Sequence, residues 1–588
     1  MTEAGPGKLS APGGRSNRIV LAFAVVAVAF AAADTYVVVL ALPAMMTTIG
    51  LDIDQLQRAA PIISGFLLGY VGVLPLIGRI ADLRGRVPVL LGCLLVFALG
   101  SVITAAAYDL PTIVSGRLIQ GIGGGGLIPP TLALVAELWP PEKRGLPLGV
   151  VGAMQELGSV VGPLYGAAVL TVASWRAIFW INAVVGVILA AGMLRRRQRV
   201  DVPGLLLLGL TLAGLSLIML APERLITGVT TGLAFLPITG ESRWLTPLAV
   251  ATAGTLLLFC LRQLFARRPM LDWRRWPNLA HQADLFGALL LCTGLGAVIL
   301  TFASAEPEAA AISSSAPILL PIAAAAFIAF ALRQRFARHP LLPRGAFAQR
   351  PAWGALIVSF LIGASLIAAL VDIPFFARLT IYRDSQVDAA MVLVRFLIAL
   401  PVGALIGGLL LRFIRPTWLT AVGMTISTAA FIHMATWEQN ALRHESELIA
   451  LVGGGLGFGL AIAPVNAALL NHTEDDVHGV ASGMLIVSRM VGMLVGISAL
   501  TTVGLRAFYQ ASAAIPPIQE LCGAPVACSS YRDAIRDAGI AQLHAVFIGA
   551  AVCAALAAIL ALLLLRPVKP VADGTPAESS RTTGETTD

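Results

Sequence analysis

The chain has 588 residues, of which 57% are apolar and 12% are charged, and its mean hydropathy is +0.86. Soluble domains carry about 25% charged residues, so this composition excludes a soluble multidomain protein. The net charge of +8 comes from Lys and Arg scattered among short loops, which favours a role in membrane topology over a nucleic-acid-binding patch. The composition predicts an all-α polytopic membrane protein.

Apolar stretches of about 20 residues, each long enough to cross the hydrocarbon core of a bilayer, recur from Ile19 to Leu565. We predict about sixteen transmembrane helices in groups of six, four and six, with fourteen as the alternative. The predicted ranges are 19–44, 59–78, 87–107, 112–137, 145–173, 177–194, 203–221, 245–265, 284–303, 317–332, 352–376, 389–411, 417–436, 448–470, 480–508 and 542–565. The first stretch is too long for a cleavable signal peptide, so we expect it to remain a membrane helix.

Arginine is concentrated in alternate loops, such as those holding Arg79, Arg84 and Arg86 or Arg333 and Arg335. The positive-inside rule places these loops and both termini in the cytoplasm. The predicted parts are a cytoplasmic tail (1–18), a six-helix bundle (19–199), a linker with two transmembrane hairpins (200–350), a second six-helix bundle (351–566) with a periplasmic segment (509–541), and a cytoplasmic tail (567–588).

The two linker hairpins are similar to each other in sequence. Residues 262–271 (Arg-Gln-Leu-Phe-Ala-Arg-Arg-Pro-Met-Leu) repeat closely as 333–342, and an Asp-x-x-Gly segment opens the helix before each of them. We interpret this as a duplication, although amphipathic helix ends can also converge on Arg and Pro. Asp284, in the second such segment, is interpreted as a helix start only. Residues 222–244, rich in Thr, Gly and Pro, suggest a small extracytoplasmic β-hairpin.

Small and charged residues form a motif between the second and third predicted helices, at Gly78, Asp82, Arg84, Gly85 and Arg86. Glycine at the first position permits close helix packing, and glycine at the fourth suits a tight turn. The aspartate can cap the next helix or pair with an arginine, while the arginines hold the loop in the cytoplasm. The alternative is a generic short cytoplasmic loop.

Two further motifs follow in the fourth and fifth predicted helices. Residues 117–123 read Arg-Leu-Ile-Gln-Gly-Ile-Gly, and the fifth helix carries Gly158, Gly162, Pro163 and Gly166. Small residues at every fourth position let helices approach closely, and proline frees a backbone carbonyl and permits a bend. These features predict a tightly packed, bendable helix.

The three motifs resemble, in order, the signatures of the major facilitator superfamily, the last being typical of its drug/proton antiporter branch. Ala167 stands where that last pattern has its final glycine. The resemblance implies a major facilitator fold, in which two six-helix bundles rock around a midplane cavity by alternating access. The corresponding loop of the second half, 408–415, has no aspartate, so the cytoplasmic gate is expected to depend on Asp82.

Segments 34–39, 155–159, 370–372, 396–401 and 489–494 resemble the mycobacterial triacylglyceride exporters of this superfamily. That family also appears as multidrug efflux transporters and works with a periplasmic lipid-binding lipoprotein. The resemblance covers both bundles and fails in the linker, where those exporters have one hairpin. It implies an actinobacterial inner-membrane protein with that lipoprotein as partner, and helices around 509–541 that extend past the membrane as a ramp for lipid.

Ionisable residues lie inside three predicted helices, at Asp34, Glu156 and Arg489. A charge near the bilayer centre costs about 2.5–3.5 kcal/mol on insertion scales, so each should face a cavity or a partner. The resemblance implies that the two acids exchange protons and that Arg489 is their counter-charge; a permanent structural ion pair is the alternative. Arg117 is open between proton coupling and binding backbone carbonyls.

Other polar residues have weaker assignments. Asp372 and Arg395 lie toward the outer ends of their helices, where snorkelling and a secondary transport role are both open. Cys522 and Cys528 lie in the longest outer loop, where oxidising conditions favour a disulfide over two free thiols. No metal or cofactor is predicted, because the proton gradient would supply the energy.

We therefore predict a proton-coupled exporter of lipids such as triacylglycerides, of amphipathic drugs, or of both. It would act as a monomer among membrane lipids. The alternative is a drug-only multidrug proton antiporter without lipid transport. A membrane enzyme or a non-transporting receptor is a remote alternative, because histidines such as His433 and His472 have no convergent acids in the sequence.

Overall fold

The computed structural model describes residues 14–51, 56–194, 201–240, 242–266, 279, 281–303, 315–383, 385–522 and 528–566. Both predicted tails fall wholly or largely outside these residues, as does the loop between the two outer cysteines. The described residues form helices and turns and contain no β-strand. The all-α prediction is confirmed for this part of the chain.

The first bundle contains the six predicted membrane crossings, two of which are broken. Its helices are α1 (Gly14–Thr48), α2 (Leu56–Gly72), α3 (Leu74–Arg84), α4 (Arg86–Ala106), α5 (Leu110–Gly125), α6 (Ile128–Leu138), α7 (Gly145–Val172) and α8 (Trp175–Leu194). The α2/α3 break precedes Pro75, and the α5/α6 break precedes Pro129 and Pro130. Proline has no N–H for the preceding turn and is tolerated at a helix start, so each crossing restarts there.

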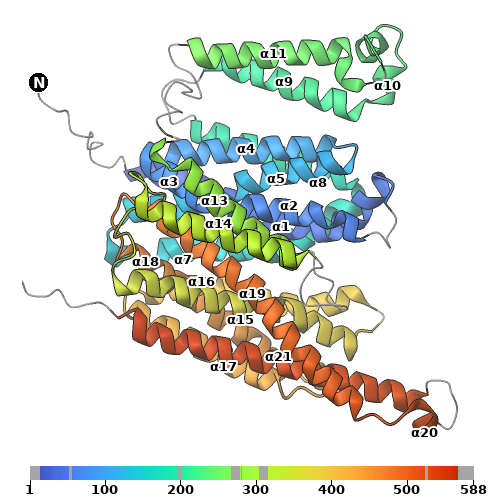
Figure 1. Cartoon of the computed structure of the whole chain (residues 1–588), viewed down its shortest axis with the longest axis vertical. Coiled ribbons are helices and arrows are strands. Elements are labelled where there is room, and N and C mark those ends of the chain that lie inside the picture. The colour runs from blue at the N-terminus through green and yellow to red at the C-terminus, as the bar shows by residue number, and fades with distance from the viewer. Residues whose placement is uncertain are drawn as a thin grey trace, which may run out of the picture.

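The second bundle is formed by α15 (Arg350–Leu379), α16 (Gln386–Leu410), α17 (Pro416–Met434), α18 (Glu447–Leu470), α19 (His478–Ala513) and α21 (Ser529–Leu564). The helices α19 and α21 each have 36 residues. At 1.5 Å per residue, each is about 54 Å long, against about 30 Å of hydrocarbon. Together with α20 (Ile518–Cys522) they project beyond the rest of the bundle (Figure 1).

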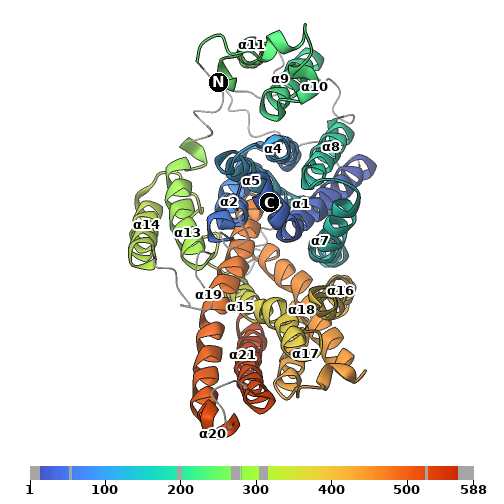
Figure 2. The ribbon, with the colours of Figure 1, turned by 90° about the vertical axis from the view of Figure 1, so that its right-hand side faces the viewer.

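The linker forms two helical hairpins, α9 (Val202–Leu220) with α11 (Pro247–Phe265) and α13 (Leu285–Ala303) with α14 (Ala316–Phe336). Figure 2 shows the first hairpin at the edge of the first bundle and the second beside α2 and α19. The β-hairpin suggested for 222–244 is wrong for the described residues. They form α10 (Glu223–Ile226), η3 (Gly232–Phe235) and η4 (Arg243–Leu245), because glycine, proline and threonine suit helical turns as well as hairpin turns.

The two hairpins share an ion pair at the same position. Asp201 accepts a hydrogen bond from Arg262 at 2.6 Å, and Asp284 accepts one from Arg333 at 2.7 Å. Each aspartate also caps the helix that follows it. Asp284 additionally accepts from the backbone N–H of Leu341 at 3.2 Å, and its side chain is fully buried. Asp284 is therefore a tertiary anchor, and the interpretation as a helix start only is wrong.

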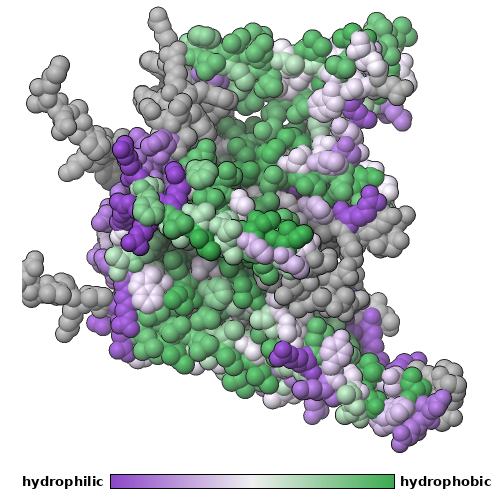
Figure 3. All heavy atoms as spheres, viewed as in Figure 1, coloured by the Kyte–Doolittle hydropathy of each residue, from purple (hydrophilic) through white to green (hydrophobic). Residues whose placement is uncertain are grey.

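Thirteen helical segments of the described chain are long and apolar enough to cross a membrane. The helices α7, α13 and α17 occupy the other three predicted crossings. Figure 3 shows an apolar band between two hydrophilic ends, as expected for a chain that spans a bilayer. We call the end that carries Arg84, Arg86 and Arg144 the arginine-rich end, and the other the far end.

Candidate functional site

Asp34, in α1, is the centre of a buried polar cluster within the first bundle. It accepts hydrogen bonds from Arg117 of α5 and from Asn182 of α8. Arg117 also donates to Gln120 at 2.8 Å, and Gln120 donates to Ser101 at 2.9 Å. Asp34 and Arg117 are each 1% exposed. Each oxygen of the Asp34 carboxylate thus has one hydrogen-bond donor, and the side chain is almost fully buried.

The Arg117 guanidinium also faces two aromatic rings. Its central carbon lies 4.1 Å from the ring centroid of Phe66 and 5.7 Å from that of Phe179. A cation over an aromatic face is stabilised by the ring quadrupole, most strongly where water is excluded. The rings and the carboxylate together compensate for burying this charge.

Glu156, in α7, pairs with Arg489, in α19, across the interface between the two bundles. The Nη1 atom of the arginine lies 3.3 Å from the carboxylate, and each side chain is 12% exposed. Tyr36 and Tyr70 lie within electrostatic reach of this pair. The pair therefore has fewer hydrogen-bond partners and is more exposed than the Asp34 cluster, and it connects the two bundles.

The arrangement corrects the prediction of a single charge cluster. Asp34 and Glu156 use different arginines, so Arg489 is the counter-charge of Glu156 only. Arg117 binds a carboxylate and a side-chain amide instead of backbone carbonyls. Sequence reasoning missed Asn182, although an asparagine inside an apolar helix is itself a signal for a buried polar contact.

A cavity of about 30 Å³ lies beside Arg489 between the bundles. Aliphatic side chains from both bundles line it, together with Gln155 of α7, Asn466 of α18 and Ser359 of α15. This space is large enough for one or two water molecules beside Arg489.

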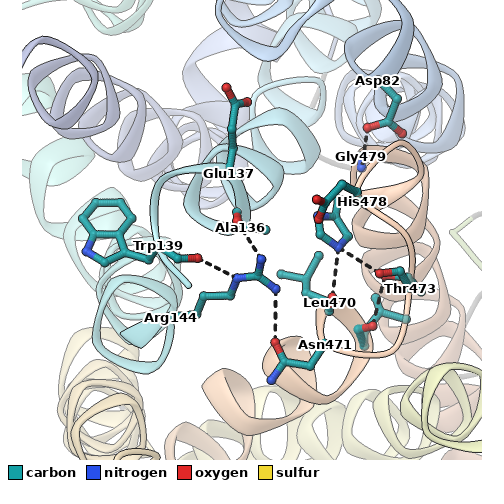
Figure 4. A network of polar contacts seen from close by, with 12 residues as sticks. Asp82, Ala136, Glu137, Trp139, Arg144, Leu470, Asn471, Thr473, His478 and Gly479 are labelled. Atoms are coloured by element: carbon teal, nitrogen blue, oxygen red, sulfur yellow. Dashed lines mark hydrogen bonds and ion pairs between the residues drawn. The ribbon is translucent and has the colours of Figure 1, made fainter. Parts of the chain in front are cut away.

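At the arginine-rich end, Asp82 connects α3 to α19. Its two carboxylate oxygens accept from the backbone N–H groups of Gly479 at 2.8 Å and Val480 at 3.0 Å (Figure 4). Because α19 begins at His478, these are first-turn N–H groups that have no partner within their own helix. The negative charge also lies at the positive end of the helix dipole. Asp82 is therefore an N-terminal cap supplied by the other bundle.

Other residues of the same motif surround this cap. Arg86 donates to Glu137 at 3.0 Å and to the backbone oxygen of Asp475, in the second bundle, at 2.7 Å. Gly85 turns the chain in the left-handed region, with φ of +91°. The Nη2 atom of Arg84 has no hydrogen-bond partner among the described residues. The structure thus brings Asp82 and Arg86 into contact with the second bundle, whereas Arg84 has no hydrogen bond to that bundle among the described residues.

Arg144 and His478 extend this contact, and neither was predicted to be a site residue; His478, expected to be solvated, is buried. Arg144 donates to the backbone oxygens of Ala136 and Trp139 and, at 3.2 Å, to Asn471 of the second bundle (Figure 4). Burial lowers the pKa of Arg144. The Nε2 atom of His478 lies 2.9 Å from the backbone oxygen of Leu470, so the imidazole holds the α18–α19 loop beneath the cap.

Glycines close the arginine-rich end by direct backbone contact. A Cβ added to Gly78 would lie 2.3 Å from the Gly479 oxygen, and one added to Gly145 would lie 2.6 Å from the Gly408 oxygen. Neither position has room for a larger residue. The two bundles therefore meet tightly at α3/α19 and at α7/α16, as their contacts also show.

The glycines of the fifth-crossing motif have another role. Gly158, Gly162 and Gly166 face α1, where an added Cβ on Gly162 would lie 2.4 Å from the Ala33 oxygen. Pro163 lies inside α7 next to this contact. The motif packs α7, which carries Glu156, directly against α1, which carries Asp34.

The remaining candidate residues lie away from these pairs. Asp372, in α15, lies beside Thr501 of α19 and has no hydrogen-bond partner among the described residues. Arg395 is exposed on α16. Cys522 and Cys528 are joined in a disulfide that connects α20 to the start of α21.

Three comparisons with known proteins are consistent with this geometry. The model of the Major Facilitator Superfamily matches residues 24–497. A triacylglyceride transporter of Mycolicibacterium hassiacum is 36% identical over 87% of this chain and 84% of its own length. One of Mycolicibacterium smegmatis is 33% identical over 94% and 88%, and one of Mycobacterium tuberculosis is 33% identical over 85% and 86%.

Solved structures share the fold at lower identity. The human organic anion transporter TETRAN has a TM-score of 0.53 and 15% identity, covering 94% of this chain and all of its own. The proton:xylose symporter XylE has a TM-score of 0.50 and 12% identity over 94% of this chain and 97% of its own. With the matching family model and the relatives above, the chain belongs to the major facilitator superfamily and is a multi-pass membrane transporter, not an enzyme.

Proposed function

We propose that this transporter is a proton-coupled exporter of neutral lipids such as triacylglycerides, with amphipathic drugs as further substrates. The observation that carries the proposal is the Glu156–Arg489 ion pair, which crosses the interface between the two bundles within the membrane. Relatives named triacylglyceride transporters, matched over most of the chain, support the lipid substrate.

Protonation of Glu156 is the proposed coupling step. A neutral carboxylic acid no longer attracts the charge of Arg489, so the two bundles lose an ion pair and can move relative to each other. The cap at Asp82 and the glycine contacts favour the state closed at the arginine-rich end. Entry of a proton from the far side would release this state, and loss of the proton to the cytoplasm would restore it.

The proposed membrane is the inner membrane, with the arginine-rich end in the cytoplasm by the positive-inside rule. The far end of α19 and α21 would then extend into the periplasm as the exit for lipid. Its disulfide and its projection beyond the bundle suit a contact with a periplasmic lipid-binding lipoprotein, which we propose as partner. The transport unit is proposed to be one chain, because both acids find their arginines within it.

Transport into proteoliposomes with an imposed pH gradient tests the proposal. We expect the gradient to accelerate movement of a labelled triacylglyceride, and Glu156→Gln to reduce the accelerated rate at least tenfold. Glu223→Gln, on an exposed turn of the linker, is the matched control and should retain wild-type transport. Normal gradient-driven transport by Glu156→Gln would contradict the coupling, and movement of a cationic dye without lipid would support the drug-only antiporter instead.

A further inference from the structure

The cavity beside Arg489 has an unusual combination of lining groups. Leu132, Val151, Ile362 and others make it aliphatic, and carboxamide side chains enter it from opposite bundles. Gln155 comes from α7 and Asn466 from α18. The two amides bring hydrogen-bonding groups to a mostly aliphatic cavity. In binding pockets, a few polar groups of this kind fix the orientation of a ligand.

These amides have unused donors. The Nδ2 atom of Asn466 donates one hydrogen to the Ile462 backbone oxygen at 2.9 Å, which leaves its second N–H free to bond a ligand. The side chain of Gln155 has no hydrogen-bond partner among the described residues, so it has two such N–H groups. By contrast, the Ser359 hydroxyl donates to the Leu485 backbone oxygen at 3.1 Å. Besides Arg489, the two amides are therefore the side chains of the lining with N–H groups available to a ligand.

Charge narrows the ligand class. The cavity lining includes Arg489 but no carboxylate, so a cationic ligand would find no acidic side chain in the lining to pair with. An anion would have to compete with Glu156, which already pairs with that arginine at 3.3 Å. A neutral group that only accepts hydrogen bonds meets neither difficulty.

We propose that Gln155 and Asn466 bind the ester carbonyl groups of a neutral acylglycerol as it passes between the bundles. This assignment rests on the proposed function, because it requires the lipid to reach the central interface. A carbonyl oxygen accepts two hydrogen bonds, one from each amide, while the aliphatic walls contact the acyl chains. Because the amides belong to different bundles, the lipid would lose one of them when the bundles separate.

The test compares a triacylglycerol with the matching trialkylglycerol ether, which has the same chains but no carbonyl groups. Both lipids, with different labels, are supplied to the same proteoliposomes under a pH gradient. The ratio of the two rates does not depend on how much protein is folded. We expect the wild type to prefer the ester about tenfold, as one or two hydrogen bonds allow.

The variants Gln155→Leu and Asn466→Leu should each lower the ester preference about threefold to tenfold. Asn440→Leu, an exposed asparagine between α17 and α18, is the control and should keep the wild-type ratio. In Gln155→Glu, the new carboxylate should raise transport of a lipophilic cation and lower that of the ester.

Two outcomes would overturn the assignment. One is an ester preference that survives in both leucine variants, and the other is equal transport of ester and ether by the wild type. Faster transport of a free fatty acid than of the ester would likewise contradict the assignment, because it would indicate an anion-binding site. The proposed function fails separately, if the wild type carries neither lipid under the gradient.

Discussion

Asp34 and Glu156 differ in burial and in the number of their hydrogen-bond partners, and we therefore assign them different roles. Asp34 is almost fully buried and accepts hydrogen bonds from Arg117 and Asn182, whereas Glu156 is 12% exposed and pairs with one arginine that lines a small cavity. A proton reaches the second carboxylate more easily than the first. Glu156 is thus the better candidate for the moving proton, and Asp34 for a polar contact that holds α1, α5 and α8 together.

Replacing Arg117 should show that role in stability. Arg117→Ala leaves the carboxylate of Asp34 buried without its cation, so we expect a loss of about 3–5 kcal/mol. The double variant Arg117→Leu/Asp34→Leu removes both charges and should recover a large part of that loss. Thermal unfolding of the purified protein in detergent measures both. Equal melting temperatures for the single and double variants would contradict the pairing.

The identity of these residues, but not their pairing, could be predicted from the sequence. A charge in an apolar helix is conspicuous, and Asp34, Glu156 and Arg489 were found in this way. Which arginine meets which acid depends on how helices far apart in the chain pack together. The predicted common cluster was wrong for that reason. Asn182 was missed because one uncharged polar residue lowers the mean hydropathy of a membrane helix only slightly.

At the scale of elements, the arginine-rich end is closed by backbone contact between α3 and α19. In Gly78→Ala, the added methyl group would lie 2.3 Å from the backbone oxygen of Gly479, which is too close for van der Waals contact. The helices α3 and α19 must therefore move apart. We expect lower transport and faster modification of a cysteine introduced at the exposed Leu83, with thiol labelling as the measurement. Gly92→Ala in α4 is the control, since nothing lies within 4 Å of its added Cβ. Unchanged labelling in Gly78→Ala would contradict this role for the contact.

The linker hairpins offer a comparison of the same ion pair in two settings. Asp284 is fully buried and also bonds Leu341, whereas Asp201 pairs with an Arg262 that is 36% exposed. We expect Asp284→Asn to cost about 1–3 kcal/mol and Asp201→Asn about 1 kcal/mol or less. Thermal unfolding of the two variants checks the order, and a larger loss for Asp201→Asn would contradict it.

The stability contributed by the Asp201–Arg262 pair should also respond to pH. Its hydrogen bond to Arg262 holds the pKa of Asp201 below the ordinary value of 3.8. A lowered pKa means that the stabilisation is fully present above pH 3.8 and is lost as the pH falls through the folded-state value. The difference in melting temperature between wild type and Asp201→Asn should therefore be constant from pH 7 to about 5 and vanish at lower pH. A difference that does not shrink as the pH falls below 3.8 would contradict the ion pair.

Element positions were largely predictable because apolar stretches of membrane length are hard to mistake. The breaks before Pro75 and Pro129 were not predicted, since a proline in a membrane helix can also be accommodated within it. The contact of Asp82 with α19 was expected only as a cap or an arginine pair. That its partner belongs to the second bundle follows from tertiary packing, which the loop sequence does not contain.

At the scale of the whole molecule, two bundles meet at the arginine-rich end and share an ion pair deeper in the membrane. We propose that protonation of Glu156 lets these bundles separate. Spin labels on the exposed Leu146 of the first bundle and Phe413 of the second report the distance across the arginine-rich end.

Pulsed electron paramagnetic resonance in lipid nanodiscs at pH 8 and pH 5 measures this separation. We expect the wild type to have a short distance between the labels at pH 8 and to gain a longer one at pH 5. Glu156→Gln should show the longer distance at both pH values, with most of the pH response lost. A pH-dependent shift in Glu156→Gln equal to that of the wild type would show that Glu156 does not control the separation.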